Sequence, residues 1–547
     1  MLSYRKLAMR VLGRPLHTGG IDSPRPASQR AAAFALTAAM LITLAAPAFA
    51  GTWYIENGDI TVKAGETKGT NKVSQGANQE VEDTNTIITN ENKDTASSNT
   101  VTIETNDKND KVEVTLKDVN IEATGGKAAV SVTGKGDTTI ELDGDNALKS
   151  DIYSSGISSS GSLTISGGEN DSLTAQGGSG ADGIYSSGSL TISGGTVTAN
   201  GGSGGGGDGG DGIWSSGGVT ISGGSTVTAN GGDGKDDYGG DGIRSDSGDV
   251  TISGGSTVTA NGGNGGNVSG DGIRSDSGDV TISGGTVKAA GGDSKDGYGG
   301  DGIRSGGVTI SGGTVNAAGG NGGKVGGYGI CSFARVAISG GTVNAAGGNG
   351  KNSNGGSDGI ISNDIDLSGS LELTAKAGRP NGKAISWAGH ELDLDTIKDK
   401  LGPGAKVTAT DANGETKQVS IPRPVEPEGP VIPEESSSSS GGGSAAPSAP
   451  ASPLPGLTVT DKDGQRISYT NTQSGNTLTV CVGRFTASFR ISLAALRQLR
   501  AEGIETIAFQ TILCSTTLSV DELLAMGGED AEAVLTHRFT DSSLTVG

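Results

Sequence analysis

The 547-residue sequence is poor in aromatic residues, cysteine and proline. Aromatic residues make up 3% of the chain, which is too few for the core of a conventional globular protein of this length. The 15 prolines follow no triplet pattern, so a collagen-like fold is excluded. The cysteines, Cys331, Cys481 and Cys514, are too few for a disulfide framework, and the sequence leaves open whether Cys481 and Cys514 pair.

Histidine is equally scarce, and this bears on catalysis. The chain has 3 histidines, of which His390 and His537 lie in segments of different composition. We find no Ser-His-Asp or Cys-His arrangement and no zinc-ligand spacing. The charged positions that stand out recur along the chain, whereas catalysis needs one unrepeated group of residues. We therefore expect the chain not to be an enzyme.

Glycine and negative charge are in excess. Glycine supplies 99 residues, which indicates either a disordered array or a repeat fold with a turn at every corner. Asp and Glu outnumber Lys and Arg by 61 to 40, a formal net charge of −21. Such a chain repels nucleic acid and anionic lipid, so we expect no nucleic-acid partner. The excess of carboxylates also favours solubility, whatever the chain binds.

Residues 1–50 are typical of a secretory signal peptide. The apolar run AAAFALTAAMLITLAAPAFA follows a basic segment, and Ala48-Phe49-Ala50 gives a small-x-small cleavage pattern, so the mature chain is expected to begin near Gly51. An uncleaved anchor is the alternative, and the long basic segment leaves the true start open, with Met9 as a candidate. No later run approaches the ~20 apolar residues of a membrane span. We expect a secreted or cell-surface protein without membrane insertion after cleavage.

An internal repeat dominates the middle of the chain. The dipeptide Gly-Ile recurs at spacings of 27 to 30 residues, and GDGIRSDSGDVTISGG stands unchanged at both 240–255 and 270–285. Repeats of this length indicate a solenoid. Each unit contains three short strand signals, of the types GIRS, DVTIS and TVTA, in which apolar residues alternate with period two. Gly-Gly pairs close the strands, as at Gly254-Gly255 and Gly262-Gly263, where we expect corners with positive φ.

The repeat predicts an all-β fold, a parallel β-helix with three short strands per coil, stacked ~4.8 Å apart. Equivalent apolar residues of successive coils then form inward columns. The predicted columns are Ile184, Ile213, Ile243, Ile273 and Ile303; Ile192, Ile221, Ile252, Ile282 and Ile310; and Val197, Val227, Val258, Val287 and Val315.

The remaining segments divide around this repeat. We expect an N-terminal cap with irregular first coils at 51–150, regular coils at 151–385, and a C-terminal cap at 386–420 that contains a helix over LDLDTIKDKLGPG. Residues 421–456 have the composition of a Pro/Ser/Gly linker. Residues 457–547 predict a small α+β domain, with a helix at LAALRQLRAEG and a second helix opened by a Ser519–Glu522 capping box.

The position after the isoleucine of Gly-Ile is expected to point outward. Aromatic rings pack against the apolar faces of sugars, and guanidinium groups grip hydroxyls or carboxylates with two hydrogen bonds. This column is the candidate ligand-binding site. The alternative is that the arginines only offset nearby aspartates and the rings only cover a strand. In successive coils the column holds Tyr185, Trp214, Arg244, Arg274 and Arg304.

Aspartates recur just before the same glycine. Stacked carboxylates repel one another unless they are neutralised, and calcium, with its several oxygen ligands, is the candidate cofactor. A calcium nonapeptide pattern fits 177–185 and 206–214, although it does not recur at its own period. Neighbouring arginines would serve equally well, and Asp-Gly is also turn chemistry. The candidate metal ligands are Asp182, Asp211, Asp241, Asp271 and Asp301. A further column is expected to be structural, its side chains bonding to one another: Asn200, Asn230 and Asn261.

The segment GDGIRSDSGDVTISGGTVKAAGG resembles the coils of secreted carbohydrate-binding β-helix proteins of clostridial and related gut Firmicutes, and VEVTLKDVNIEA and TTIELDGDNAL resemble their early coils. The resemblance covers roughly residues 52–385. It implies a right-handed helix of pectate-lyase-like shape, polysaccharide binding without cleavage, and calcium sites, which the resemblance places at Asp241, Asp271 and Asp301.

Together these observations predict a non-catalytic polysaccharide-binding protein that is secreted or associated with the cell wall. The first alternative is a structural or adhesive surface protein of unknown ligand that holds the C-terminal domain away from the cell. The second is a polysaccharide lyase. No sorting motif is visible in the sequence, so the mode of surface attachment stays open.

Overall fold

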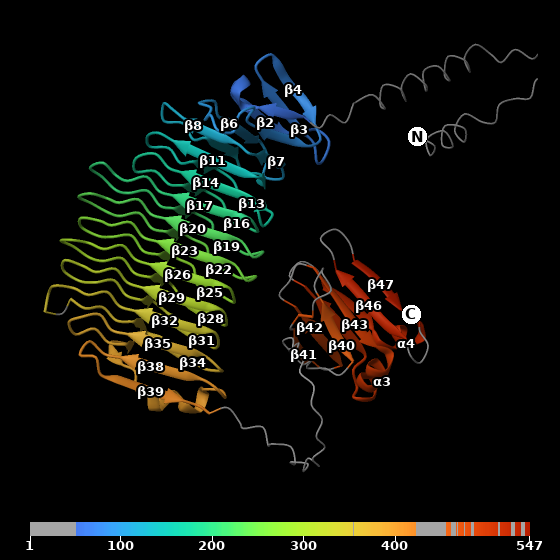
Figure 1. Ribbon diagram of the computed structural model, residues 1–547. Helices are drawn as coiled ribbons and strands as arrows, with labels where there is room; N and C mark the ends of the chain where they lie inside the picture. Colours follow the sequence, from blue (N-terminus) through green and yellow to red (C-terminus); the bar gives the residue numbers. More distant parts are fainter. Residues whose placement is uncertain are drawn as a thin grey trace, which may run out of the picture. The chain divides into compact units, whose positions relative to one another are not determined.

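The chain winds into a parallel β-helix, as the computed structural model shows (Figure 1). The structure describes residues 51–353, 355–422, 456–460, 466–467, 469–474, 476–482, 486–511, 515–526, 531–537 and 542–546. The predicted signal peptide and almost all of the predicted linker lie outside these residues. In the described part, no helix has the length and apolar character that crossing a membrane requires.

Three parallel sheets run the length of the helix, and each coil contributes one strand to each sheet. Sheet 1 is built from the GIRS-type strands. In spatial order it comprises β37 His390–Glu391, β36 Ile385–Trp387, β33 Ile360–Ser362, β30 Ile330–Ser332, β27 Ile303–Ser305, β24 Ile273–Ser275, β21 Ile243–Ser245, β18 Ile213–Ser215, β15 Ile184–Ser186, β12 Ile157–Ser159, β9 Val130–Gly134, β6 Val101–Thr105, β2 Ile60–Ala64, β3 Asn71–Gln75 and β4 Asn78–Asp83.

Sheets 2 and 3 hold the DVTIS-type and TVTA-type strands. Sheet 2 comprises β1 Thr52–Tyr54, β5 Thr86–Thr89, β7 Lys111–Lys117, β10 Asp137–Asp143, β13 Leu163–Gly167, β16 Leu190–Ile192, β19 Val219–Ile221, β22 Val250–Ile252, β25 Val280–Ile282, β28 Val308–Ile310, β31 Arg335–Ile338 and β34 Asp364–Leu367. Sheet 3 comprises β39 Thr416–Ser420, β38 Lys406–Thr410, β35 Glu372–Lys376, β32 Thr342–Ala346, β29 Thr314–Ala318, β26 Thr286–Ala290, β23 Thr257–Asn261, β20 Thr226–Asn230, β17 Thr196–Asn200, β14 Ser172–Gln176, β11 Asp145–Ser150 and β8 Asn120–Ala123.

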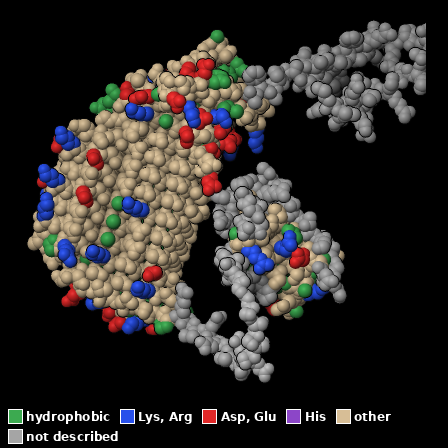
Figure 2. Space-filling view, viewed as in Figure 1, with side chains coloured by type: hydrophobic (Ala, Val, Ile, Leu, Met, Phe, Trp, Pro, Cys, Tyr) green, Lys and Arg blue, Asp and Glu red, His purple; other side chains and the backbone are tan. Residues whose placement is uncertain are grey.

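The three predicted inward columns are confirmed. Ile243 pairs in register with Ile273, Ile252 with Ile282, and Val258 with Val287, so like side chains stack on like. The members of all three columns are at most 1% exposed. One coil alone could not bury these side chains, whereas the stack produces one continuous core. In the view of Figure 2, the outer faces of sheets 2 and 3 are mostly backbone and uncharged polar groups, with charged side chains scattered singly.

Glycine is required at the corners of the coils for two different reasons, positive φ and close backbone approach. Gly254 and Gly255 have φ of 64° and 74°, as predicted for a corner in the left-handed region. At Gly262 and Gly263 the prediction of positive φ is wrong. There a Cβ atom would lie 2.0 Å from the carbonyl oxygen of Gly270 or Gly232, so close backbone approach excludes a side chain.

Both ends of the helix reverse strand direction. At the N-terminal end β2, β3 and β4 pair antiparallel, and at the C-terminal end β39 pairs antiparallel with β38 and β37 with β36. A short 3-10 helix, η1 Ile55–Asn57, follows β1. The helix predicted in the C-terminal cap is also a 3-10 helix, η2 Leu394–Lys400. Gly402 and Pro403 follow closely and end it.

The C-terminal residues form a separate α+β arrangement with its own core. One sheet has the order β40 Leu457–Thr460, β43 Ala487–Ser492, β46 Glu532–His537, β47 Ser542–Val546, and the other β41 Thr470–Ser474, β42 Thr477–Cys481, β44 Thr506–Gln510, β45 Ser515–Ser519. The two helices are α3 Leu493–Ala501 and α4 Val520–Met526. As predicted, α3 buries its leucines, and the amide of Glu522 bonds the Ser519 hydroxyl at 3.4 Å. Cys331 and Cys481 are free thiols, and Cys514 lies outside the described residues.

Candidate ligand-binding face of sheet 1

The five residues proposed as ligand-binding lie in one register on the outer face of sheet 1. Each occupies the middle of a three-residue strand, between a buried isoleucine and a buried serine, and each is half-buried. The register runs Tyr185, Trp214, Arg244, Arg274, Arg304 through successive coils. The structure therefore brings the predicted residues together as a single column.

The two aromatic residues of the column contact each other and the first arginine. The rings of Tyr185 and Trp214 meet edge to face, with centroids 5.2 Å apart and an interplanar angle of 73°. The guanidinium carbon of Arg244 lies 5.1 Å from the centroid of the Trp214 ring, within cation–π range. The Nε1 atom of Trp214 is buried and makes no hydrogen bond. Tyr185, Trp214 and Arg244 thus form one packed cluster.

A further aromatic residue, Phe333, completes the far end of the column, and the sequence reasoning missed it. The guanidinium carbon of Arg304 lies 5.1 Å from the Phe333 ring centroid, and Phe333 is 54% exposed. Because Arg304 pairs with Cys331, Cys331 holds the column position in this coil, and Phe333 stands two residues after it. The available signal was an aromatic residue directly after GICS. We call Tyr185, Trp214, Arg244, Arg274, Arg304 and Phe333 the sheet 1 strip.

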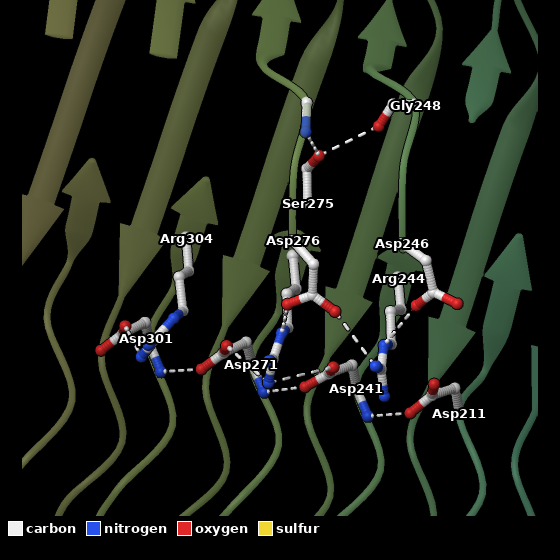
Figure 3. Close-up of polar contacts among 12 residues, drawn as sticks. Asp211, Asp241, Arg244, Asp246, Gly248, Asp271, Ser275, Asp276, Asp301 and Arg304 are labelled. Carbon is white, nitrogen blue, oxygen red and sulfur yellow. Dashed lines mark hydrogen bonds and ion pairs between the residues drawn. The ribbon is translucent and has the colours of Figure 1, made fainter. Parts of the chain in front are cut away.

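The aspartates proposed as metal ligands form a hydrogen-bonded ladder beside the strip (Figure 3). In each coil Oδ1 of the aspartate accepts the backbone N–H of its counterpart one coil further along. These bonds measure 2.8 Å for Asp182, 2.5 Å for Asp211, and 2.6 Å for Asp241, Asp271 and Asp301, the last accepting from Tyr328. All five side chains are buried. The ladder therefore satisfies backbone donors at the corner where each coil enters sheet 1.

Burial changes the acidity of this ladder. Burial raises the pKa of Asp182 and Asp301 to about 6. The same cause, with the charge of the next carboxylate, raises the pKa of Asp241 and Asp271 to about 7. The pKa of Asp211 is raised well above its ordinary value by burial and by the carboxylates on either side. Part of the ladder is therefore protonated near neutral pH, which relieves the repulsion that the sequence analysis expected.

The arginines of the strip lie between this ladder and a second, half-exposed pair of carboxylates. Arg244 donates to Asp246 at 3.1 Å and to Asp276, one coil on, at 3.0 Å. Arg274 donates to Asp276 at 2.6 Å and has Asp241 and Asp271 at 4.0 Å on its other side. Figure 3 shows this alternation of carboxylate and guanidinium across neighbouring coils. The guanidinium planes are thereby fixed in orientation.

The positive charge of Arg304 is the least neutralised by carboxylates among the three arginines of the strip. It donates to Asp301 at 3.4 Å, and the position taken by Asp246 and Asp276 in earlier coils is Gly306 in its own coil. Its side chain is also the most exposed, at 39%. More of its donors consequently face solvent.

The aspartate ladder does not fit a calcium site. Each Oδ1 already accepts a backbone N–H, and the nearest cations to Oδ2 of Asp241, Asp271 and Asp301 are arginines. Among the described residues, no group of three or more His, Cys, Asp or Glu side chains converges on a point that could hold a metal ion. Since calcium needs several oxygen ligands, these contacts favour neutralisation by arginine and by protonation.

The asparagine column is structural, as predicted. Nδ2 of Asn230 donates to Oδ1 of Asn200, and Nδ2 of Asn261 to Oδ1 of Asn230, both at 2.8 Å.

Comparisons with protein-family models, curated proteins and solved structures found no match. The function must therefore be argued from the geometry of the molecule itself.

Proposed function

We propose that this protein binds a polysaccharide along the sheet 1 strip, without cleaving it, as a secreted or cell-surface protein. The observation that carries the proposal is the unbroken register of five half-buried side chains, two aromatic and three guanidinium, with the exposed ring of Phe333 beside the last guanidinium. Such a column repeats a binding group at every coil.

The strip matches a repeating ligand in chemistry and in spacing. Neighbouring strands lie ~4.8 Å apart, and a pyranose unit advances its polymer by a similar distance. The rings of Trp214 and Phe333 offer apolar faces for sugar C–H groups, while the arginines offer fixed N–H donors to hydroxyls. Ion pairs to Asp246 and Asp276 hold the donors of Arg244 and Arg274 in place before a ligand arrives, which lowers the entropic cost of binding.

The same geometry supports binding rather than cleavage. A general acid must come within hydrogen-bond reach of the bond that breaks. Asp241 and Asp271 have raised pKa values, but both are only 5% exposed and their Oδ1 atoms are occupied by the backbone. Their arrangement repeats unchanged from one coil to the next, which is typical of a scaffold.

One observation favours a second candidate, a structural or adhesive surface protein. Arg244 and Arg274 are both neutralised by neighbouring aspartates, as the alternative interpretation of the column requires. In that case the helix serves as a spacer for the C-terminal domain, and the strip contributes only local order.

A glycan array probed with the full chain separates these candidates. We expect binding to at least one polysaccharide, with no release of unsaturated product, and the comparison of calcium with chelator tests the predicted cofactor. The double variant Trp214→Ala/Arg244→Ala should bind at least about tenfold more weakly, whereas Tyr238→Ala, an exposed tyrosine outside the strip, should bind as the wild type does. Absence of binding to every glycan would leave the spacer as the function, and product release would establish a lyase.

A further inference from the structure

A second candidate site lies at the N-terminal end of sheet 1, where strands β2, β6, β9 and β12 begin. A cavity of about 500 Å³ opens there to solvent. Its lining is almost entirely polar, and hydroxyl groups predominate. The residues that the argument uses are Asp59, Thr102, Lys127, Ser131, Tyr153 and Ser158.

This cavity is continuous with the sheet 1 strip. Thr102 pairs in register with Ser131, Ser131 with Ser158, and Ser158 with Tyr185, the first residue of the strip. The cavity floor and the strip are therefore one column of outward side chains on the same sheet. A chain molecule lying on the strip would reach the cavity one coil beyond Tyr185, after ~4.8 Å.

Tyr153 stands at the rim of the cavity as an exposed aromatic ring. It is 83% exposed, the highest value among the large hydrophobic side chains of the described residues. Its φ is 50°, in the left-handed region that residues other than glycine and asparagine rarely adopt. Strained backbone of this kind persists only where the surroundings impose it, and it is concentrated at binding sites.

The loop that carries Tyr153 is fixed on both sides. The carboxylate of Asp151 accepts the backbone N–H groups of Gly125 at 2.8 Å, Gly126 at 3.0 Å and Ile152 at 2.8 Å. On the other side, the hydroxyl of Ser154 donates to the carbonyl of Gly126 at 2.6 Å. The ring is thus presented on an ordered loop, which makes it a platform for stacking that loses little entropy when it binds.

The charges of the cavity cancel. Nζ of Lys127 lies 3.7 Å from Oδ2 of Asp59, and these are the only charged residues in the lining. Oδ1 of Asp59 accepts the backbone N–H of Thr100 at 2.7 Å, which fixes the carboxylate. The cavity consequently offers hydroxyl, carboxylate and ammonium groups to a ligand rich in hydroxyls, without a net charge that would select an acidic one.

We infer that this cavity is the terminal subsite for a neutral glycan, with a pyranose ring stacked on Tyr153 and its hydroxyls bonded to Ser131, Ser158, Asp59 and Lys127. The inference rests on the proposed function, because the strip would hold the sugars that follow. It assigns a neutral sugar class and a direction to the bound chain: one end lies in the cavity and the remainder extends across Tyr185 toward Arg304.

The test uses the full chain and four probes: cellohexaose, xylohexaose, mannohexaose and hexagalacturonate, each measured by titration calorimetry and saturation-transfer NMR. The informative variant is Tyr153→Gly, because glycine removes the ring and relieves the left-handed strain, so its thermal midpoint should equal or exceed that of the wild type. Tyr238→Ala is the matched control, an exposed tyrosine away from the cavity.

We expect at least one neutral hexamer to bind and Tyr153→Gly to weaken that binding about tenfold, with loss of saturation transfer to the terminal sugar. If a neutral hexamer binds, depends on Trp214 and Arg244, and is indifferent to Tyr153→Gly, the terminal subsite is overturned while the proposed function stands. Dependence on Tyr153 for hexagalacturonate alone overturns the neutral class. Failure of the wild type to bind any saccharide, in these titrations and on the array, overturns the proposed function itself.

Discussion

The backbone N–H of Asp271 donates a 2.6 Å hydrogen bond to Oδ1 of Asp241, its counterpart one coil earlier. Each buried carboxylate in the ladder thus bonds the next coil through main chain rather than through a ligand. An aspartate at this corner pairs a donor that would otherwise be buried without a partner, and the identical repeat preserves that pairing from coil to coil.

Replacing Asp241 distinguishes its hydrogen bond from its charge. Asp241→Ala leaves the N–H of Asp271 buried without an acceptor, and we expect a loss of ~1–3 kcal/mol in the free energy of unfolding. Asp241→Asn keeps an acceptor oxygen and removes a buried charge, so at pH 8 it should be at least as stable as the wild type. Urea denaturation of the full chain measures both. Equal losses of unfolding free energy for the Ala and Asn variants would contradict the idea that residue 241 stabilises the fold as a hydrogen-bond acceptor that need not be charged.

The raised pKa values of the ladder predict how stability depends on pH. An unfolded aspartate titrates near pH 3.9, whereas the native pKa is about 6 for Asp182 and Asp301 and about 7 for Asp241 and Asp271. Between these values the native state holds more protons, so its stabilisation is complete below about pH 4 and is lost as the pH rises to about 7. Calorimetry should therefore give a lower thermal midpoint at pH 8 than at pH 5.

The control for this pH effect is the combined replacement of Asp211, Asp241 and Asp271 by asparagine. Such a variant has no buried carboxyl at those positions to titrate. Its thermal midpoint should change much less between pH 5 and pH 8 than that of the wild type. If the midpoint changed as much as in the wild type, the pH dependence would originate in other groups.

Arg274 sets part of that pH range. Its guanidinium lies 4.0 Å from Oδ2 of both Asp241 and Asp271, and its charge lowers the pKa of each. Arg274→Ala should raise both pKa values further, so the loss of stability should extend to higher pH. Carboxyl carbon NMR checks the titration directly. Arg274→Lys retains a cation and should move the titration less than Arg274→Ala does.

Close backbone approach makes some glycines irreplaceable. A Cβ atom at Gly240 would lie 1.9 Å from the carbonyl oxygen of Gly210, so Gly240→Ala forces neighbouring coils apart. We expect a loss of more than ~3 kcal/mol, at the high end for a single substitution. At Gly206 nothing lies within 4 Å of a built Cβ, and Gly206→Ala should be close to neutral. Thermal denaturation of the two variants, side by side, measures the difference.

Much of the helix follows from the sequence because its signals are local and repeated. Ile243 and Ile252 lie in segments where apolar and polar residues alternate with the period of two that is typical of a strand. Because the repeat is thirty residues long, each of them stacks on the equivalent isoleucine of the next coil. The outward column could be predicted for the same reason. At the C-terminal cap the predicted helix is present, but Leu394 and Ile397 suit either kind of helix, so the sequence pattern did not distinguish the 3-10 form.

The candidate sites depended on contacts that no local pattern shows. The sequence displays the aspartates, but the acceptor role of Asp241 requires the main chain of another coil, so calcium, arginine and turn chemistry all stayed open as explanations. Phe333 contributes to the strip from a neighbouring position, and in a coil 27 residues after the previous one. The cavity beside Tyr153 is assembled from irregular coils that share no repeat, and only the three-dimensional structure brings Asp59 to Lys127.

The reversal of strand direction at the helix ends has a consequence for self-assembly. A stack of parallel strands in identical register is a template on which further chains could polymerise, as happens in amyloid. At the C-terminal end, β37 and β39 run antiparallel to β36 and β38, so the outer edges of sheets 1 and 3 there have the opposite strand direction. At the N-terminal end β3 is reversed, and β4, after a second antiparallel pairing, runs in the direction of the coils again. At these two C-terminal edges a second chain would not find the parallel register of the coils, so the hairpins hinder end-to-end polymerisation there.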